Sequence, residues 1–200
     1  MTQTVYIVDD NQVIRNALQQ LLEISGFTVK SYADGASFLA DCTEQCSGCV
    51  LLDMAMPEMS GHDVQVQLRE HDIHIPIIFL SGHGEVPDAV RAIQVGAVDF
   101  LQKPVDSTTL LARIRQSLAL DAERRKKRIL VDEIRQRYAM LSPREKEVMT
   151  LVVDGYGNKE IARKLSLSPR TVEVHRNHVM YKMGAKNLAQ LVRMSANFHS

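Results

Sequence analysis

The chain has 200 residues, 45% of them apolar, and as many acidic as basic side chains. This length fits one large domain or two small ones, and no apolar run reaches the ~20 residues that a membrane helix needs. The first residues lack the basic start and long apolar stretch of a secretory signal, so we expect a cytoplasmic protein without a membrane segment.

Residues 1–120 carry 15 acidic and 7 basic side chains, whereas residues 121–200 carry 9 acidic and 17 basic ones. This division predicts two domains with different partners, the basic one being the candidate for nucleic acid. Two solvated surfaces that differ by chance are the weaker alternative.

Short apolar runs alternate with helix-like segments in the first half. The segment Asn11–Ser25 has apolar residues at helical spacing, and Gly26 ends it as a C-cap. Alternating strands and helices predict an α/β fold with a doubly wound, five-stranded parallel sheet. The expected strands are Val5–Val8, Phe27–Tyr32, Cys49–Leu52, Ile77–Leu80 and Val98–Leu101.

Polar side chains follow four of these strands: Asp9 and Asp10, then Asp53, Ser81 and Lys103. Open α/β sheets bind ligands beyond the carboxyl ends of their strands, so we expect these groups to share one pocket. Crowded carboxylates repel one another, and Mg²⁺ relieves this while binding phosphate oxygens. Transfer of a phosphoryl group to a carboxylate is an established covalent strategy. Each residue taken alone is better explained as a turn, cap or surface residue, and only their joint placement at strand ends favours this chemistry.

Residues 1–120 resemble the receiver domains of two-component response regulators, which have a flavodoxin-like fold. The resemblance rests on Asp9-Asp10, Asp53-Met54-Ala55-Met56-Pro57, Ser60-Gly61, Ser81 and Lys103-Pro104. It implies that Asp53 is the phosphoacceptor and that a histidine kinase is the donor. It also implies that Asp10, Asp53 and the Ala55 carbonyl bind Mg²⁺, with Asp9 acting mainly through water.

The same resemblance implies that Ser81 moves toward the phosphate, that Phe100 swings inward with it, and that the bond before Pro104 is cis. An aromatic residue at a strand end is equally often part of the core, so the role of Phe100 stays open. The chain departs from the family at Ser81, where Thr is commoner, at Gly82, where Ala is frequent, and at Val105, where Phe is usual in close relatives.

Three cysteines, Cys42, Cys46 and Cys49, lie between the second and third expected strands. Their odd number predicts no disulfide framework. A tetrahedral zinc site needs a fourth ligand, and no further Cys or His is nearby. Since Cys49 opens an apolar run, we expect these cysteines to pack in the core or at the surface.

The segment from Asp106 to about Tyr138 has no Pro or Gly and predicts a long helix, of which 121–137 is a linker. The basic run 124–128 fits a solvated face better than a contact with DNA phosphates.

The second half predicts a small four-helix domain over 138–200. Ser142-Pro143-Arg144-Glu145 is a helix start with a capping box, and a second helix is expected over Asn158–Leu165. Ser168 and Pro169 begin a third helix that runs to about Met183, and a fourth follows from Asn187. Two helices joined by a three-residue turn form a helix-turn-helix whose second helix enters the major groove of DNA.

The third helix has an apolar face at Val172, Val179 and Met183 and an opposite, mostly polar face. On that face, Val174 fits a thymine methyl, Asn177 fits adenine and Glu173 fits cytosine. Basic residues nearby would mostly hold phosphates. The candidate DNA-binding residues are Asn158, Lys159, Arg170, Thr171, Glu173, Val174, His175, Arg176, Asn177 and Lys182.

Residues 138–200 resemble LuxR-type DNA-binding domains, through 141–145, 158–162 and 168–176. The stretch Ser168–Met183 and His83-Gly84-Glu85-Val86-Pro87 look closest to the FixJ-like branch. Many relatives have Lys where this chain has Glu173.

These features predict a phosphorylation-controlled transcriptional regulator, expected to activate, with promoter DNA, a homodimer partner and RNA polymerase as candidate partners. A phosphatase with an aspartyl-phosphate intermediate is a weaker alternative, because such enzymes place a second acid where this chain has Ala55. A protein-binding adaptor is the third possibility, and a salt-dependent gel shift would distinguish it from a DNA-binding protein.

Overall fold

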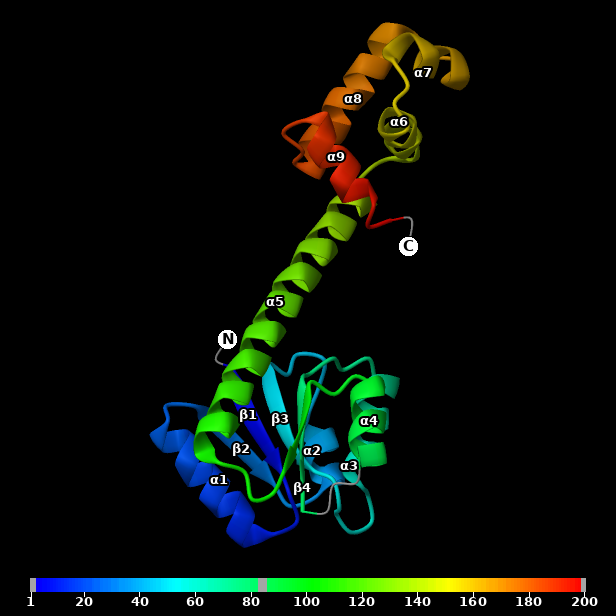
Figure 1. Ribbon diagram of the computed structural model, residues 1–200. Coiled ribbons are helices and arrows are strands. Elements are labelled where there is room, and N and C mark those ends of the chain that lie inside the picture. The colour runs from blue at the N-terminus through cyan, green and yellow to red at the C-terminus, as the bar shows by residue number, and fades with distance from the viewer. Residues whose placement is uncertain (1–2, 83–85, 199–200) are drawn as a thin grey trace. The chain divides into compact units, whose positions relative to one another are not determined.

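The computed structural model describes residues 3–82 and 86–198, and of residues 86–88 only the backbone. The motif expected at His83–Pro87 therefore lies outside the described residues, apart from the backbone of its last two. The chain divides into two compact units, Met1–Arg125 and Lys126–Ser200, each with its own core (Figure 1). No helix in the described ranges combines the length and apolarity needed to span a bilayer.

The first unit is built around a parallel sheet with strand order β2-β1-β3-β4-β5. The three central strands, β1, β3 and β4, are nearly continuous apolar runs because both faces of the sheet are covered by helices, whereas the edge strands β2 and β5 are more polar and less buried. Their bounds are Thr4–Val8 (β1), Thr28–Tyr32 (β2), Gly48–Asp53 (β3), Ile77–Ser81 (β4) and Asp99–Gln102 (β5). The predicted five-stranded α/β fold is confirmed.

Helices of the first unit lie on both faces of this sheet (Figure 1). One face packs around Phe38, Val64 and Ala92, which come from α2, α3 and α4. The other packs around Leu22 of α1 and Ile114 of α5. The helices are α1 (Gln12–Ile24), α2 (Gly35–Asp41), α3 (Gly61–Glu70), α4 (Val86–Gln94) and α5 (Ser107–Ala139).

Gly61 brings the start of α3 against the end of β3. A Cβ at this position would lie 2.3 Å from the carbonyl oxygen of Asp53 and 3.0 Å from Cε1 of Phe79. The Gly61 amide donates to the Met54 carbonyl at 3.1 Å, which fixes the loop after β3. Only glycine permits so close a backbone approach, so the loop that carries Asp53 is held by packing as well as by hydrogen bonds.

At the opposite, amino edge of the sheet, the buried side chain of Asp121 holds α5 to the start of β3. Its Oδ2 accepts hydrogen bonds from the Gly48 amide at 3.0 Å and from Ser47 Oγ at 3.1 Å. One turn further along α5, the Arg125 guanidinium donates to the carbonyls of Gln45 and Cys46 at 3.2 and 3.0 Å. Four hydrogen bonds, three of them buried or half-buried, thus join this helix to the start of β3 and the loop before it.

The second unit contains α6 (Pro143–Val153), α7 (Asn158–Leu165), α8 (Pro169–Met183) and α9 (Leu188–Ser195). The expected signals begin them: Ser142 and Glu145 form a capping box, and Ser168 caps α8 with Pro169 in its first turn. Ser166 adopts a left-handed conformation in the turn between α7 and α8, with φ of 54°. The predicted helices of this half are therefore confirmed.

The last turns of α5 belong to the core of the second unit. Ile134 is buried there, and Tyr138 stacks on Phe198 with ring centroids 4.2 Å apart. Arg137 donates to the carbonyl of Met183 at 3.0 Å and so caps the end of α8. A Cβ on Gly184 would overlap this guanidinium, because it would lie 2.4 Å from Nη1.

Candidate functional site

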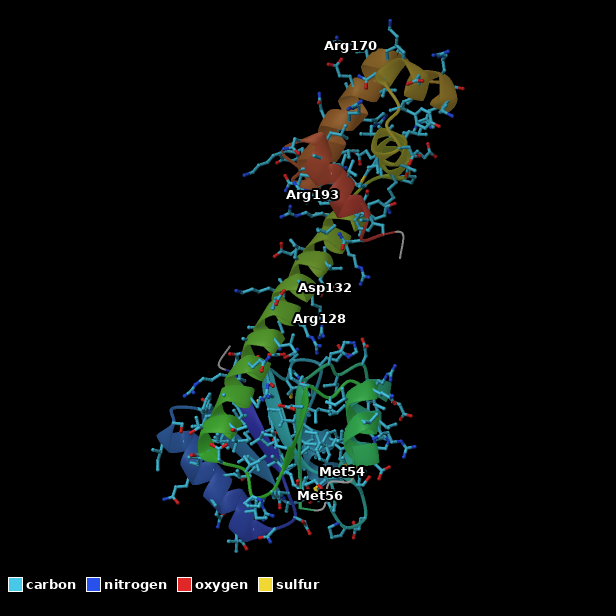
Figure 2. The ribbon with its side chains drawn as sticks, viewed as in Figure 1. Met54, Met56, Arg128, Asp132, Arg170 and Arg193 are labelled. Atoms are coloured by element: carbon cyan, nitrogen blue, oxygen red, sulfur yellow. The ribbon has the colours of Figure 1, made fainter. Side chains whose placement is uncertain are left out.

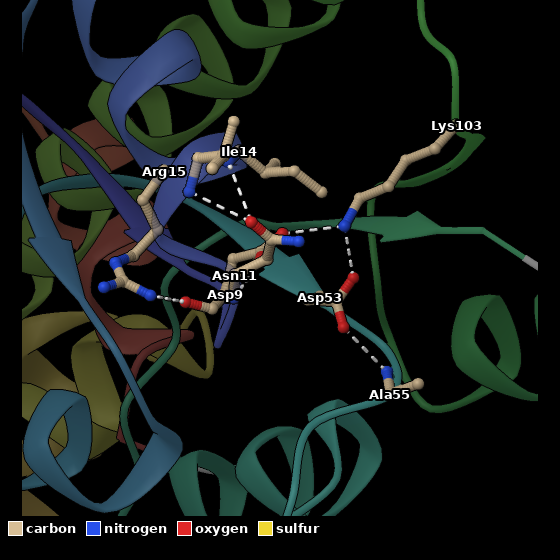
Figure 3. A network of polar contacts seen from close by, with 8 residues as sticks. Asp9, Asn11, Ile14, Arg15, Asp53, Ala55 and Lys103 are labelled. Atoms are coloured by element: carbon tan, nitrogen blue, oxygen red, sulfur yellow. Dashed lines mark hydrogen bonds and ion pairs between the residues drawn. The ribbon is translucent and has the colours of Figure 1, made fainter.

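The ends of β1, β3 and β5 bring two carboxylates and one ammonium group together. Lys103 Nζ lies 2.7 Å from Oδ2 of Asp9 and 2.5 Å from Oδ1 of Asp53 (Figure 3). Both acids are almost fully buried, with exposed fractions of 1% and 6%. One lysine charge therefore bridges two carboxylates that would otherwise repel each other in a region poor in water.

Neighbouring groups orient both acids (Figure 3). The amide of Asn11 donates to Asp9 Oδ1 at 2.9 Å, and Arg15 donates to the Asp9 carbonyl at 2.7 Å. The amide of Ala55 donates to Asp53 Oδ2 at 3.0 Å. These contacts fix both carboxylates before any ligand is bound.

These groups line one pocket of about 370 Å³ at the carboxyl edge of the sheet. Ser81 borders it with a buried side chain, and Asp10 contributes an exposed carboxylate. The pocket is lined by Asp9, Asp10, Asn11, Ile14, Asp53, Met54, Ala55, Ser81, Gly82 and Lys103. The strand-end residues thus meet in space as the sequence predicts.

Phe100 is half-buried on β5, with its ring centroid 6.4 Å from that of Phe79. It also borders a separate apolar depression with Val90 and Ile93 of α4. The peptide bond between Lys103 and Pro104 is cis, as the resemblance implied.

Burial raises the pKa of Asp53, and the nearby charge of Asp9 adds to this rise, while hydrogen bonds from Lys103 and Ala55 oppose it. Burial by itself lowers the pKa of Lys103, but hydrogen bonds to Asp53 and Asp9 outweigh it and raise the pKa. Lys103 therefore stays charged, and a group that adds negative charge at Asp53 meets a cation already in place.

The donors around the pocket suit a hard cation such as Mg²⁺. Asp10, Asp53 and the Ala55 carbonyl offer oxygen ligands, and Mg²⁺ binds through one or two carboxylates together with waters and phosphate oxygens. Among the described residues, no three His, Cys, Asp or Glu side chains are arranged as a complete metal cluster. Mg²⁺ does not require such a cluster, because waters and phosphate oxygens complete its ligand set. The oxygen atoms of the residues present therefore fit Mg²⁺.

In the second unit, α8 has one buried and one exposed face. Val172, Val179 and Met183 are buried in the core, as expected. The exposed face carries Arg170, Glu173, Val174, Asn177 and Tyr181 (Figure 2 labels Arg170), with Val174 47% and Tyr181 87% exposed. Both apolar side chains are therefore accessible to a partner of this face.

Several predicted DNA-binding residues have partners within the unit. Arg176 donates to Asn158 Oδ1 at 2.7 Å, which joins α8 to the start of α7. Lys182 lies 2.6 Å from the buried Glu145, so its charge is already balanced. His175 is half-buried, and its Nδ1 has no hydrogen-bond partner among the described residues. Lys159 is exposed and Thr171 is half-buried.

Two family models match the chain. The response regulator receiver domain matches residues 5–115, and the luxR family of bacterial regulatory proteins matches residues 139–195. Together they cover both units. The chain belongs to the two-component response regulators. Its second unit is a LuxR-type DNA-binding domain, as predicted.

Relatives of this response regulator match it over nearly their whole length. It is 44% identical to the response regulator protein TodT of Pseudomonas putida, over 96% of this chain and 84% of TodT. It is 43% identical to the transcriptional regulatory protein FixJ of Rhizobium meliloti, over 96% of this chain and 94% of FixJ. The solved structure of the response regulator StyR is similar, with a TM-score of 0.89 and 40% identity over 98% of this chain and 99% of StyR.

Sequence reasoning missed the polar contacts that support these sites in the response regulator. Arg15 is one helical turn into α1 and reaches the Asp9 carbonyl, but nothing in its spacing marks it. The pairing of Glu145 with Lys182 joins residues 37 positions apart. Gly61 carried a usable signal, because a glycine at a helix start soon after Asp53 indicates a close backbone approach.

Proposed function

We propose that this response regulator accepts a phosphoryl group from a sensor histidine kinase on Asp53 and binds promoter DNA through α8. The observation that carries the proposal is the fixed carboxylate of Asp53, held by Lys103 and Ala55 at the edge of an open pocket. Phosphoryl transfer asks a protein mainly for positioning and charge neutralisation. The chain is not proposed to act as an enzyme beyond assisting its own phosphorylation and dephosphorylation.

Each residue of the pocket has a proposed role. Asp53 Oδ attacks the phosphorus of the kinase phosphohistidine, the P–N bond breaks, and the kinase imidazole leaves and takes a proton from water. Lys103 pairs with the added negative charge instead of bridging the two acids. Ser81 offers a hydroxyl to the phosphoryl oxygens, and Phe100 turns inward as Ser81 moves. Mg²⁺ bound by Asp10, Asp53 and the Ala55 carbonyl, with Asp9 acting through water, would supply further neutralisation of charge.

DNA recognition is proposed to divide between two groups of residues on and around α8. Val174, Asn177 and Glu173 are placed to read base edges in the major groove. Lys159, Arg170, Thr171, His175 and Arg176, with Asn158 and Lys182, are proposed to hold phosphates or to position those that do. The exposure of Val174 within a polar face supports this division.

Phosphorylation is proposed to produce a homodimer that activates transcription, with RNA polymerase as a candidate partner. A symmetric dimer would place two recognition helices about 34–36 Å apart, one turn of DNA. The attached phosphate adds about −1.5 to −2 charge. Lys103, which balances two carboxylates before phosphorylation, then faces this additional negative charge as well.

The test compares wild type with Asp53→Asn. After incubation with a small phosphodonor and Mg²⁺, wild type should gain one phosphoryl group by intact mass and bind promoter DNA more tightly, while Asp53→Asn should do neither. Labelling of Asp53→Asn would refute the phosphoacceptor assignment. DNA binding that does not weaken with added salt would refute the nucleic-acid interface.

A further inference from the structure

The exposed face of α8 continues beyond the residues assigned to DNA, to an aromatic side chain that the proposed function does not use. Tyr181 is 87% exposed, whereas Val172, Val179 and Met183 on the other side of the helix are buried. At about 100° per residue, Tyr181 lies about 180° from the centre of that buried face. Its ring and hydroxyl therefore face solvent, and packing in the core does not account for an aromatic residue here.

Tyr181 ends a stripe of exposed residues that begins in the first turn of α8. Arg170, Val174, Asn177 and Tyr181 follow one another at spacings of four, three and four residues, which places them on one side of an α-helix. Figure 2 shows Arg170 at the start of this helix. The same side faces DNA in the proposed function, on which the assignment of Tyr181 rests.

The position of Tyr181 along the helix axis places it at the wall of the major groove instead of over the bases. It lies seven residues beyond Val174, which is about 10 Å along an α-helix. The early residues of a recognition helix contact base edges, and the major groove is about 12 Å wide. With Val174 over the bases, a side chain about 10 Å further on lies beyond half the groove width, where the sugar–phosphate backbone runs.

The basic residue in the last turn of α8 is already engaged within the unit. Lys182 Nζ lies 2.6 Å from Glu145 and donates to the Met140 carbonyl at 3.5 Å. Residues 121–200 still carry 17 basic and 9 acidic side chains, so this half of the chain attracts anions. A phosphate at the last turn of α8 therefore meets the neutral hydroxyl of Tyr181 in place of the Lys182 charge.

We propose that Tyr181 binds a phosphate of the DNA backbone at the edge of the major groove, by donating its phenolic hydrogen to a phosphate oxygen. Tyrosine is among the side chains that donate to DNA phosphates. Because the phenol is neutral, the contact strengthens binding without releasing a counterion of its own, so it adds nothing to the salt dependence. This separates Tyr181 from Arg170, whose charge contributes to both affinity and salt dependence.

The experiment measures binding of the full chain, treated with the phosphodonor and Mg²⁺, by fluorescence anisotropy at several salt concentrations. The probes are a short duplex that wild type has enriched from a random-sequence pool and a scrambled duplex of the same composition. Tyr181→Phe removes only the hydroxyl, and Arg170→Ala removes a charge from the same stripe. The matched control is Tyr138→Phe, because the Tyr138 ring stacks on Phe198 in the core. Each variant is checked for a native circular dichroism spectrum.

Tyr181→Phe should bind both duplexes about 3- to 10-fold more weakly, the effect of losing one hydrogen bond. Its salt slope and the affinity ratio between the two duplexes should equal those of wild type, whereas Arg170→Ala should lower the slope by about 1. Tyr138→Phe should bind like wild type. In a series of enriched duplexes that each carry one methylphosphonate, one position should weaken wild type by the same factor and leave Tyr181→Phe unaffected.

Equal affinities of Tyr181→Phe and wild type would overturn the contact and leave the assignment of α8 to DNA standing. A changed ratio between the two duplexes would overturn it in favour of a base contact. A loss of the dimer in sedimentation would overturn it in favour of a contact with a second copy of the chain. If wild type enriches no duplex from the pool, the proposed function fails and the Tyr181 contact fails with it.

Discussion

Replacing Glu145 should weaken the DNA-binding unit more than any neighbouring surface change. The carboxylate is only 5% exposed, and its Oε2 accepts from the Ser142 amide at 2.8 Å and from Lys182 Nζ at 2.6 Å. Glu145→Ala removes both contacts at once, so it breaks one half of the capping box of α6 and releases Lys182 near the end of α8. The Ser142 hydroxyl still accepts from the backbone amide of residue 145.

The magnitude follows from these two contacts. The lost capping interaction costs about 1 kcal/mol, and the lost charged hydrogen bond costs about 1.5–3 kcal/mol. Lys182 is 36% exposed and can regain water, so the cost stays below that of stranding a fully buried charge, about 3–5 kcal/mol. We expect a loss of about 2–4 kcal/mol, and each kcal/mol lowers the melting temperature of a unit this small by about 4–8 °C.

The loss should depend on pH. The hydrogen bond from Lys182 lowers the pKa of Glu145 to about 2, from an ordinary value of 4.5. Because the folded-state pKa is depressed, the stabilisation is complete above pH 4.5 and disappears as the pH falls toward 2. Glu145→Gln keeps the shape but cannot ionise, so its deficit relative to wild type should shrink across this window.

The assay is urea unfolding of the full chain at several pH values, with hydrogen exchange of α6 and α8 to localise the change. The matched control is Glu147→Gln, since Glu147 is half-exposed and pairs with Arg144 on the surface at 2.5 Å; its effect should stay below about 1 kcal/mol. A deficit of Glu145→Gln that is constant from pH 4.5 to 2 would refute the reasoning, as would a Glu145→Ala cost equal to that of the control.

Three further predictions concern the other contacts. Gly61→Ala should cost about 1–3 kcal/mol by overpacking and slow phosphorylation of the adjacent loop. Gly82→Ala is the control and should leave thermal stability unchanged, because no atom lies within 4 Å of the added Cβ. Equal melting curves for Gly61→Ala and Gly82→Ala would contradict the packing argument. Asp121→Ala should lower the free energy of unfolding by about 1–3 kcal/mol, because it leaves buried donors unpaired. Asp132→Ala, on an exposed part of α5 (Figure 2), should leave the free energy of unfolding unchanged in urea titrations. Arg170→Ala should weaken DNA binding and reduce the salt slope of log K by about 1; an unchanged slope in gel shifts would exclude a phosphate contact there.

Local chemistry in the sequence determined the elements and their ends. Apolar spacing separated strands from helices, and the Ser-Pro starts at Ser142 and Ser168 marked where α6 and α8 begin. The acid pocket was also predictable, because the carboxyl ends of parallel strands must meet at one edge whatever the loops do. Asp9, Asp53 and Lys103 were found by that rule rather than by their spacing.

Only the tertiary structure decided which side chains pair. Lys182 looked like a phosphate ligand in the sequence, yet the packing of α8 on α6 brings it to Glu145. The three cysteines lie within eight consecutive positions, but the path of the chain puts Cys49 in the core on one face of the sheet and Cys42 and Cys46 on the other. Periodicity and capping report the surroundings within a few residues along the chain. Contacts between distant segments depend on how whole elements pack, and that information is not local.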